Sequence, residues 1–194
     1  MLKERIREIE EVVILPKKFH NKILGYKINS KKIHFDYLPK SYRLKKGNYT
    51  QEDLDKPLDE IAVPIETKKR AKILSLSINI SKFEVNKPIP ARFNIYKEKD
   101  GKPDQLINVD DIIVELKPEK VNNGTFSVDV SDKEIWVKGK YFVSFQPLNK
   151  DFEGDFFVSS GFLGKGYYRS YLSKWIKIPI SGRVGIYANA KVEK

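Results

Sequence analysis

From Lys72 onward, apolar and polar residues alternate with a period of two, the pattern of strands with one buried face. The clearest segment is 74–80, where Leu and Ile at even positions are separated by Ser and Asn. Ten short strands with almost no helical pattern predict an all-β fold, an antiparallel, jelly-roll-like β-sandwich, with a barrel as the nearest alternative. The expected strands are 74–80, 91–95, 112–116, 126–130, 135–137, 141–148, 156–158, 167–172, 175–180 and 184–188.

Turn signals separate several of these segments. Residues 100–103 read Asp-Gly-Lys-Pro, a strong turn sequence. Residues 122–124 read Asn-Asn-Gly, and Asn-Gly accepts the positive φ angles of a hairpin turn. Earlier in the chain, Thr50 and the acidic residues after it predict one capped helical turn that Pro57 ends.

The first 71 residues have a different pattern from the rest. Residues 2–11 have helical spacing, and 12–15 form a β-branched run that predicts a strand ended by Pro16. Residues 17–50 are polar, basic and aromatic, which predicts loops with one or two edge strands. We therefore expect an N-terminal segment over 1–71, with an irregular basic arm, and a β-sandwich domain over 72–194.

Composition removes several kinds of active site. The 194 residues contain no Cys, so neither a disulfide, a thiolate nucleophile nor a zinc–thiolate site can form. Aromatic residues make up 12% of the chain, and their large buried areas can supply a core without covalent cross-links.

The net charge of +11 is uneven, because residues 12–50 contain ten basic residues and one acid. This arm has aromatic residues among its lysines, the composition of a single-strand nucleic-acid or other polyanion binder. A solvated basic surface is the alternative interpretation. The candidate polyanion-binding residues are Lys17, Lys18, Lys31, Lys32, Lys45 and Lys46.

No apolar run approaches the length needed to cross a bilayer, so no transmembrane segment is predicted. The first residues also lack the apolar region of a signal peptide. Two expectations stay open: a cytoplasmic protein whose native start is Met1, or a fragment of an exported protein.

Some segments resemble a known family. Residues 10–18 and 22–25 resemble the junction after a carboxypeptidase-regulatory-like (transthyretin-like) β-domain in bacterial cell-envelope proteins. The all-β domain downstream in those proteins is similar to segments 90–96, 100–103, 111–114, 128–130 and 141–145. The resemblance implies an exported protein, in the periplasm or associated with the outer membrane, with a further domain before this one. It supplies no catalytic motif.

The densest aromatic–cationic cluster is the candidate ligand-binding site, with residues Tyr167, Tyr168, Arg169 and Trp175. If exposed, these side chains could form a platform for sugar rings or for nucleic-acid bases. If packed, they would belong to the core, and Arg169 would be a structural ion-pair or cation–π partner.

Other candidate chemistry is weaker. His20 and His34 are the only histidines and lie among lysines that would repel a cation. The acids of residues 151–155 lack the glycine and glutamate of a calcium-binding EF-hand loop. The Gly- and Lys-containing segment 160–166 lacks both ends of the phosphate-binding loop pattern. No metal, cofactor or catalytic residue is predicted.

The sequence thus predicts a non-enzymatic β-sandwich accessory or binding domain of a cell-envelope protein, with a glycan or another envelope protein as partner. A basic nucleic-acid- or polyanion-binding module is the alternative. A glycoside-active enzyme with paired carboxylates is a third possibility, although the sequence places no such pair at a defined separation.

Overall fold

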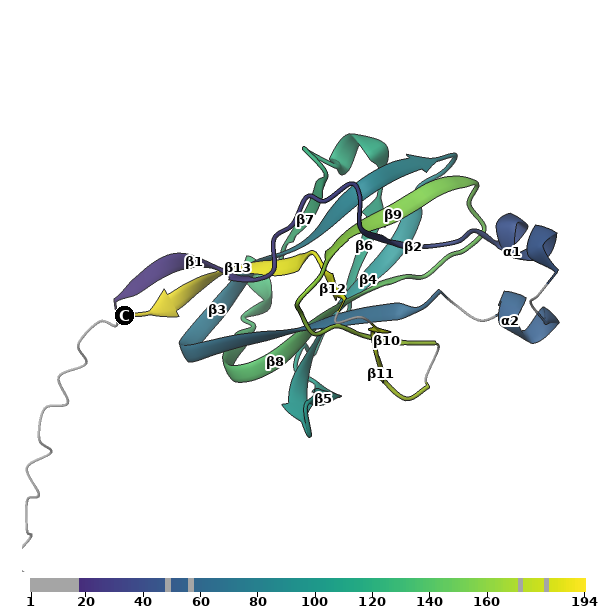
Figure 1. Ribbon diagram of the computed structural model, residues 1–194. Coiled ribbons are helices and arrows are strands. Elements are labelled where there is room, and N and C mark those ends of the chain that lie inside the picture. Colours follow the sequence, from purple (N-terminus) through teal and green to yellow (C-terminus); the bar gives the residue numbers. More distant parts are fainter. Residues whose placement is uncertain (1–17, 48–49, 56–57, 171–172, 180–181) are drawn as a thin grey trace, which may run out of the picture.

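The computed structural model describes residues 18–47, 50–55, 58–170, 173–179 and 182–194 (Figure 1). Strands dominate, and the helices are short. The elements in chain order are β1 (Phe19–Gly25), β2 (His34–Asp36), α1 (Lys40–Lys46), α2 (Gln51–Asp55), β3 (Glu60–Val85), β4 (Ile89–Lys99), β5 (Lys102–Leu106), β6 (Ile112–Leu116), η1 (Pro118–Lys120), β7 (Thr125–Asp129), η2 (Ser131–Lys133), β8 (Trp136–Pro147), β9 (Gly154–Gly161), β10 (Tyr167–Arg169), β11 (Ile176–Lys177), β12 (Arg183–Val184) and β13 (Ile186–Glu193).

Strand β3, with 26 residues, connects the two halves of the fold. Its first part pairs with β8 on one side and β10 on the other. Its middle pairs with β13 and β7, and its end pairs with β9. All these pairings are antiparallel, and they confirm the predicted all-β, sandwich-like fold.

A bulge allows β3 to contribute one part to each of the two layers of the sandwich. The register with β8 shifts between Thr67 and Ala71, so that residues 68–70 lie opposite Lys138 alone. Extra residues in one strand of a pair bend that strand. Figure 1 shows β3 turning back sharply at this end of the molecule, beside β1 and β13. Residues 60–67 therefore lie in one layer and residues 71–85 in the other.

A second bulge changes which residues of β3 reach the core. The register with β13 moves from Ser75 to Ile73 between adjacent β13 residues, so Leu74 has no partner there. Leu76 and Ile78 are buried as the alternation predicts, whereas Leu74 is only partly buried and Ile73 takes the inward position. The prediction for Leu74 is wrong because one unpaired residue reverses the alternation.

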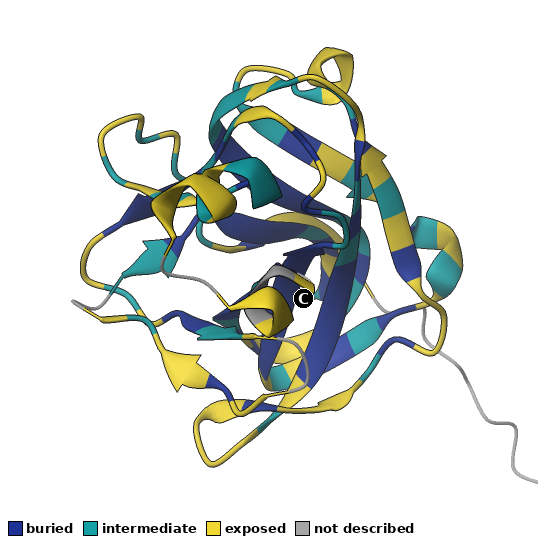
Figure 2. Cartoon of the chain, turned by 90° about the vertical axis from the view of Figure 1, so that its right-hand side faces the viewer, coloured by how far each residue is buried: buried dark blue, intermediate teal, exposed yellow. Residues whose placement is uncertain are grey.

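The layers enclose a core rich in aromatic rings. Phe145 lies at its centre, in edge-to-face contact with Phe93 at 5.1 Å and with Phe156 at 6.3 Å between ring centroids. Each such pair adds about 0.5–1.5 kcal/mol beyond the area it buries. In Figure 2 the buried segments of the strands face the centre, and exposed segments lie around the outside.

The N-terminal segment is part of the same sheet rather than a separate unit. β1 pairs along its whole length with β13, and β2 pairs with β9. These are the one or two edge strands that the sequence predicts, and α2 is the predicted helical turn. The boundary drawn between residues 71 and 72 falls inside β3, which continues through it because both sides bury residues in one core. The predicted helix over 2–11 and strand over 12–15 lie outside the described residues.

The two strong turn sequences behave differently. Asp100 and Gly101 have φ angles of 52° and 76° and join the β4–β5 hairpin. Asn123 and Gly124 also have positive φ, at 49° and 69°. The strands that flank this second turn do not pair with each other, because β6 pairs with β4 and β7 pairs with β3.

We expect Gly154→Ala to destabilise the fold strongly. Gly154 has a φ of +103°, and a Cβ atom there would lie 1.9 Å from the backbone oxygen of Glu84. Left-handed strain and overpacking together predict a loss of about 3 kcal/mol or more in the free energy of unfolding. Gly47→Ala is the matched control, because Gly47 has a φ of +67° with open space around it, and should cost only about 1 kcal/mol. Equal losses in urea denaturation would contradict this.

We expect Tyr141→Phe to stabilise the protein. The Tyr141 hydroxyl is buried and has no hydrogen-bond partner among the described residues. Removing an unpaired buried hydroxyl should raise the free energy of unfolding by about 1 kcal/mol at neutral pH.

The same variant should resist alkaline conditions. Burial raises the pKa of Tyr141, so the folded state keeps this phenol neutral at a pH where the unfolded chain ionises. Ionisation of Tyr141 therefore leaves the free energy of unfolding unchanged below about pH 10 and lowers it above that pH. Urea denaturation at neutral and alkaline pH should show a smaller alkaline loss for the variant, and lower stability at neutral pH would contradict the first expectation.

Candidate functional site

The structure packs the predicted aromatic–cationic cluster against the outer face of the first part of β3. β10, which contains Tyr167, Tyr168 and Arg169, pairs with β3, and Trp175 precedes β11. Tyr167 and Trp175 are only 8% and 9% exposed and form a second apolar cluster with Ala62, Tyr96 and Phe142. The Tyr167 and Trp175 rings are therefore not available as a stacking platform, whereas Tyr168 is only partly buried.

A buried ion pair joins this cluster to β3. Glu60 is 2% exposed. Arg169 donates to its Oε2 from Nε at 2.8 Å and from Nη2 at 2.7 Å. The other oxygen, Oε1, accepts from Asn94 Nδ2 at 2.9 Å, from the Tyr96 hydroxyl at 2.8 Å and from the Ser144 hydroxyl. Every lone-pair direction of the carboxylate is thus engaged.

Arg169 also stacks on aromatic rings. Its guanidinium carbon lies 4.4 Å from the Trp175 ring centroid and 5.5 Å from that of Tyr96. The expectation that Arg169 is a structural ion-pair or cation–π partner is confirmed on both counts. Burial, followed by the charge of Glu60, raises the pKa of Tyr96, so its hydroxyl remains a donor to Glu60. Since the Glu60 carboxylate is buried and both of its oxygens accept hydrogen bonds within the network, it is not free to act as an acid or base on a substrate.

The candidate polyanion-binding lysines do not form one patch. Lys18 lies at one end of the molecule, where its carbonyl accepts from the backbone of Lys194 at 2.8 Å. Lys31 and Lys32 lie between β1 and β2. Lys45 and Lys46 are on α1, at the opposite end of the molecule from β1 in Figure 1. Lys17 lies outside the described residues.

The weaker candidates are likewise separated. His34 Nε2 lies 3.3 Å from Asp36 Oδ1 and its ring stacks on Phe157, whereas His20 is on β1. Asp155 pairs with Lys82, and Glu153 accepts from Ser41 at 2.7 Å. Among the residues that the structure describes, no group of three His, Asp or Glu side chains could hold a metal ion.

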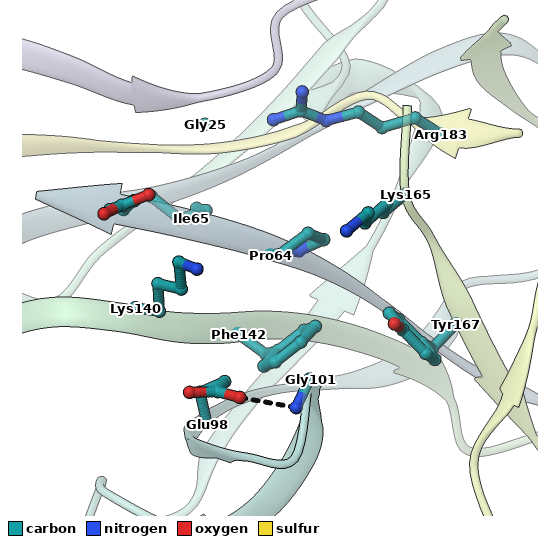
Figure 3. Close-up of a pocket in the computed structure, with 11 residues that line it drawn as sticks. Gly25, Pro64, Ile65, Glu98, Gly101, Lys140, Phe142, Lys165, Tyr167 and Arg183 are labelled. Carbon is teal, nitrogen blue, oxygen red and sulfur yellow. Dashed lines mark hydrogen bonds between the residues drawn. The ribbon is translucent and has the colours of Figure 1, made fainter. Parts of the chain in front are cut away.

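The outer face of the β3–β8 layer is hollowed beside the Glu60 network. One hollow of about 470 Å³ lies over Pro64 and Phe142, with Arg183 and Lys165 on one side and Glu98 and Gly101 on the other (Figure 3). A second, of about 480 Å³, adjoins it at Leu163 and Lys177. They share Pro64, Lys165 and Arg183, and we call them together the outer groove. Its full lining is Gly25, Pro64, Ile65, Glu66, Glu98, Gly101, Lys140, Phe142, Leu163, Gly164, Lys165, Tyr167, Lys177 and Arg183.

Cations outnumber acids in the outer groove. Lys140, Lys165 and Lys177 are exposed, and none forms an ion pair within the described part of the chain. The carboxylate of Glu98 accepts from the backbone N–H of Gly101, as Figure 3 shows. Glu66 and Glu98 are the two acids of the lining, against the three lysines and Arg183, so the groove carries a net positive charge.

Arg183 is the most constrained of these cations. Its guanidinium carbon lies 4.5 Å from the Tyr26 ring centroid, and its Nε is buried without a hydrogen-bond partner in the described residues. Burial lowers the pKa of this guanidinium. A Cβ on Gly164 would lie 2.4 Å from the Arg183 side chain, so the glycine makes room for the arginine. Such a partly desolvated guanidinium favours an anionic partner.

The sequence does not point to this groove, because its lining comes from seven separate stretches of chain. The one local signal is the segment 160–166, which fails as a phosphate-binding loop. Its Gly164 and Lys165 nevertheless lie in the groove, where they contribute space and charge.

No protein-family model, curated protein or solved structure matches this chain. The resemblance to cell-envelope domains stays a prediction. Within the described residues, no helix has the length and apolar character required to span a membrane.

We expect Arg169→Met to destabilise the fold by about 3–5 kcal/mol, because it leaves the buried Glu60 carboxylate without its cation. The double variant Glu60→Gln/Arg169→Met should recover part of the loss, since no charge is then buried. Urea denaturation measures both. Lys117→Met is the control, because it removes an exposed pair with Glu115 at 2.9 Å and should leave stability within experimental error. A small loss for Arg169→Met would show that the network is not what holds β10 in place.

Proposed function

We propose that this chain is a non-catalytic binding domain that holds an acidic carbohydrate in the outer groove. The observation that carries the proposal is the set of unpaired cations around an apolar floor. Lys140, Lys165 and Lys177 surround Pro64, and Arg183 presents a partly desolvated guanidinium at the same place. Carboxylate or sulfate groups on a sugar chain would supply the missing negative charge.

The groove suits a sugar acid better than a nucleic acid. Single-stranded nucleic acids bind through bases stacked on exposed aromatic rings. The rings that line the outer groove in the described residues are Phe142 and Tyr167, at 2% and 8% exposure. Because both rings are almost fully buried, they leave little surface for stacking, so charge and hydrogen bonding have to supply the affinity.

The buried Glu60 network supports a binding role rather than a catalytic one. Its carboxylate is the most enclosed acid near the groove, and Arg169 holds it ionised and engaged. A general acid or base needs a free position facing its substrate. The network instead fixes β10, and therefore Tyr167, at the wall of the groove.

A domain that binds an acidic glycan would fit the cell envelope, where such polymers occur outside the cytoplasm. Placement in the periplasm or at the outer membrane, as the sequence resemblance implies, remains part of the proposal. The alternative of a nucleic-acid-binding module is an outcome that the experiment below separates.

We expect the protein to bind polygalacturonate, a linear polymer of sugar acids, and not dextran, a neutral polymer. Lys165→Glu/Lys177→Glu should weaken polygalacturonate binding by about tenfold or more, because it reverses two groove charges. Binding should also weaken as salt rises, since the cations are exposed. Isothermal titration calorimetry measures these affinities.

The matched control is Lys45→Glu/Lys46→Glu, which makes the same charge change on α1. It should leave polygalacturonate binding close to that of the unaltered protein. Equal losses for both double variants would indicate attraction by net charge alone, and tighter binding of single-stranded DNA than of polygalacturonate would favour the nucleic-acid function.

A further inference from the structure

A third hollow lies at the end of the molecule where β3 turns back. It measures about 450 Å³. Three stretches of chain meet there: the start of β1, the β3 bulge and the end of β13. The lining residues are His20, Lys22, Glu66, Thr67, Lys68, Lys69, Val192, Glu193 and Lys194. We call this the terminal hollow.

The bulge explains why this end is basic. Residues 68–70 are all basic and lie opposite Lys138 alone, so the bulge concentrates three cations at one bend. The Thr67 hydroxyl donates to the carbonyl of Lys69 at 2.8 Å, which fixes the shape of the bend. Lys68 and Lys69 remain exposed.

Arg70 has a different role from the two lysines. Its guanidinium carbon lies 4.2 Å from the centroid of Trp136, whose ring also contacts Phe19 at 6.0 Å. This stacking engages Arg70 and covers the indole ring. Lys68 and Lys69, together with Lys22 and Lys194, are therefore the cations that the terminal hollow offers to a ligand.

The terminal hollow and the outer groove meet at one lining residue of β3. Glu66 lines both, and Pro64 in the outer groove is two residues before it on the same strand. At about 3.3 Å per residue, the three steps from Pro64 to Thr67, before the bend, span roughly 10 Å. Glu66 is the acid at the junction, and it lies directly opposite Lys140 in the β3–β8 register.

Resting on the proposed function, we propose that the terminal hollow is a second subsite and that the ligand is a linear polyanion. The acidic sugar chain would follow the outer face of β3 from Arg183 and Lys165 past Lys140 to Lys68 and Lys69. A single sugar acid would occupy only one hollow. A chain long enough to reach both would gain affinity because its second contact is intramolecular.

The test is the length dependence of binding with oligogalacturonates. A short oligomer, such as the disaccharide, should bind the unaltered protein and Lys68→Glu/Lys69→Glu equally. A long oligomer, such as the dodecasaccharide, should bind the unaltered protein at least about tenfold more tightly than the short one. In Lys68→Glu/Lys69→Glu, the long oligomer should lose most of this advantage in affinity over the short one. Calorimetry gives the affinities, and thermal unfolding checks that each variant folds.

Two further variants keep the two proposals apart. Lys165→Glu/Lys177→Glu should weaken short and long oligomers alike, whereas Lys45→Glu/Lys46→Glu should change neither. If Lys68→Glu/Lys69→Glu leaves the long-chain gain intact while Lys165→Glu/Lys177→Glu abolishes binding, the second subsite is wrong and the outer groove stands. If no variant changes the binding of either oligomer, both proposals are wrong.

Discussion

Strand β3 has to bury side chains in both layers of the sandwich, and this requirement shapes the rest of the molecule. A straight strand of 26 residues would extend far beyond a core of this size. The bulge at residues 68–70 resolves the conflict by turning the strand back. β8 pairs across the bend, while β13 and β10 each pair with only one part of β3, so their positions follow from where the bend lies.

The ion pair between Glu60 and Arg169 fixes the position of β10 beside the first part of β3. Glu60 is the first residue of β3, so the network fixes the point at which the strand enters the sheet. It fixes β10 at the same time, because Arg169 ends that strand. The groove wall beside Tyr167 depends on this contact, although neither charged residue lines the groove.

The sequence predicts the strands whose two faces differ, and it fails where both faces are buried or where the partner is distant. Segments 91–95 and 126–130 alternate in sequence; the first falls inside β4, and the second extends one residue beyond β7, which ends at Asp129. In the first part of β3 the outer face is buried as well, because Ala62 belongs to the outer apolar cluster that also contains Tyr96 of β4. The sequence of this part therefore shows no alternation of apolar and polar residues. Pro64 also argues against a central strand. It is tolerated because β10 pairs only with residues 60–62 and ends before reaching it.

In the candidate site too, the sequence predicts what depends on neighbouring residues and misses what depends on distant ones. The packed role of Arg169 follows from its aromatic neighbours in the sequence, but its partner Glu60 is 109 residues away and carries no local signal. The groove cations come from β8, from the connection before β10, from β11 and from β12, so only the folded chain brings them together. Charge density along the sequence instead favours the N-terminal arm, whose lysines the fold distributes over both ends of the molecule.

The bulge also allows the number of cations at the bend to change without a change in the register of the two layers, which a regular strand would not allow. Inserting or deleting a residue inside a paired strand reverses every side chain beyond it. At residues 68–70 the chain already has more residues than its partner, so a change of length there can be absorbed by the bend. The number of cations at this end of the molecule can therefore vary between related chains while the register of both layers, and with it the core, stays as it is.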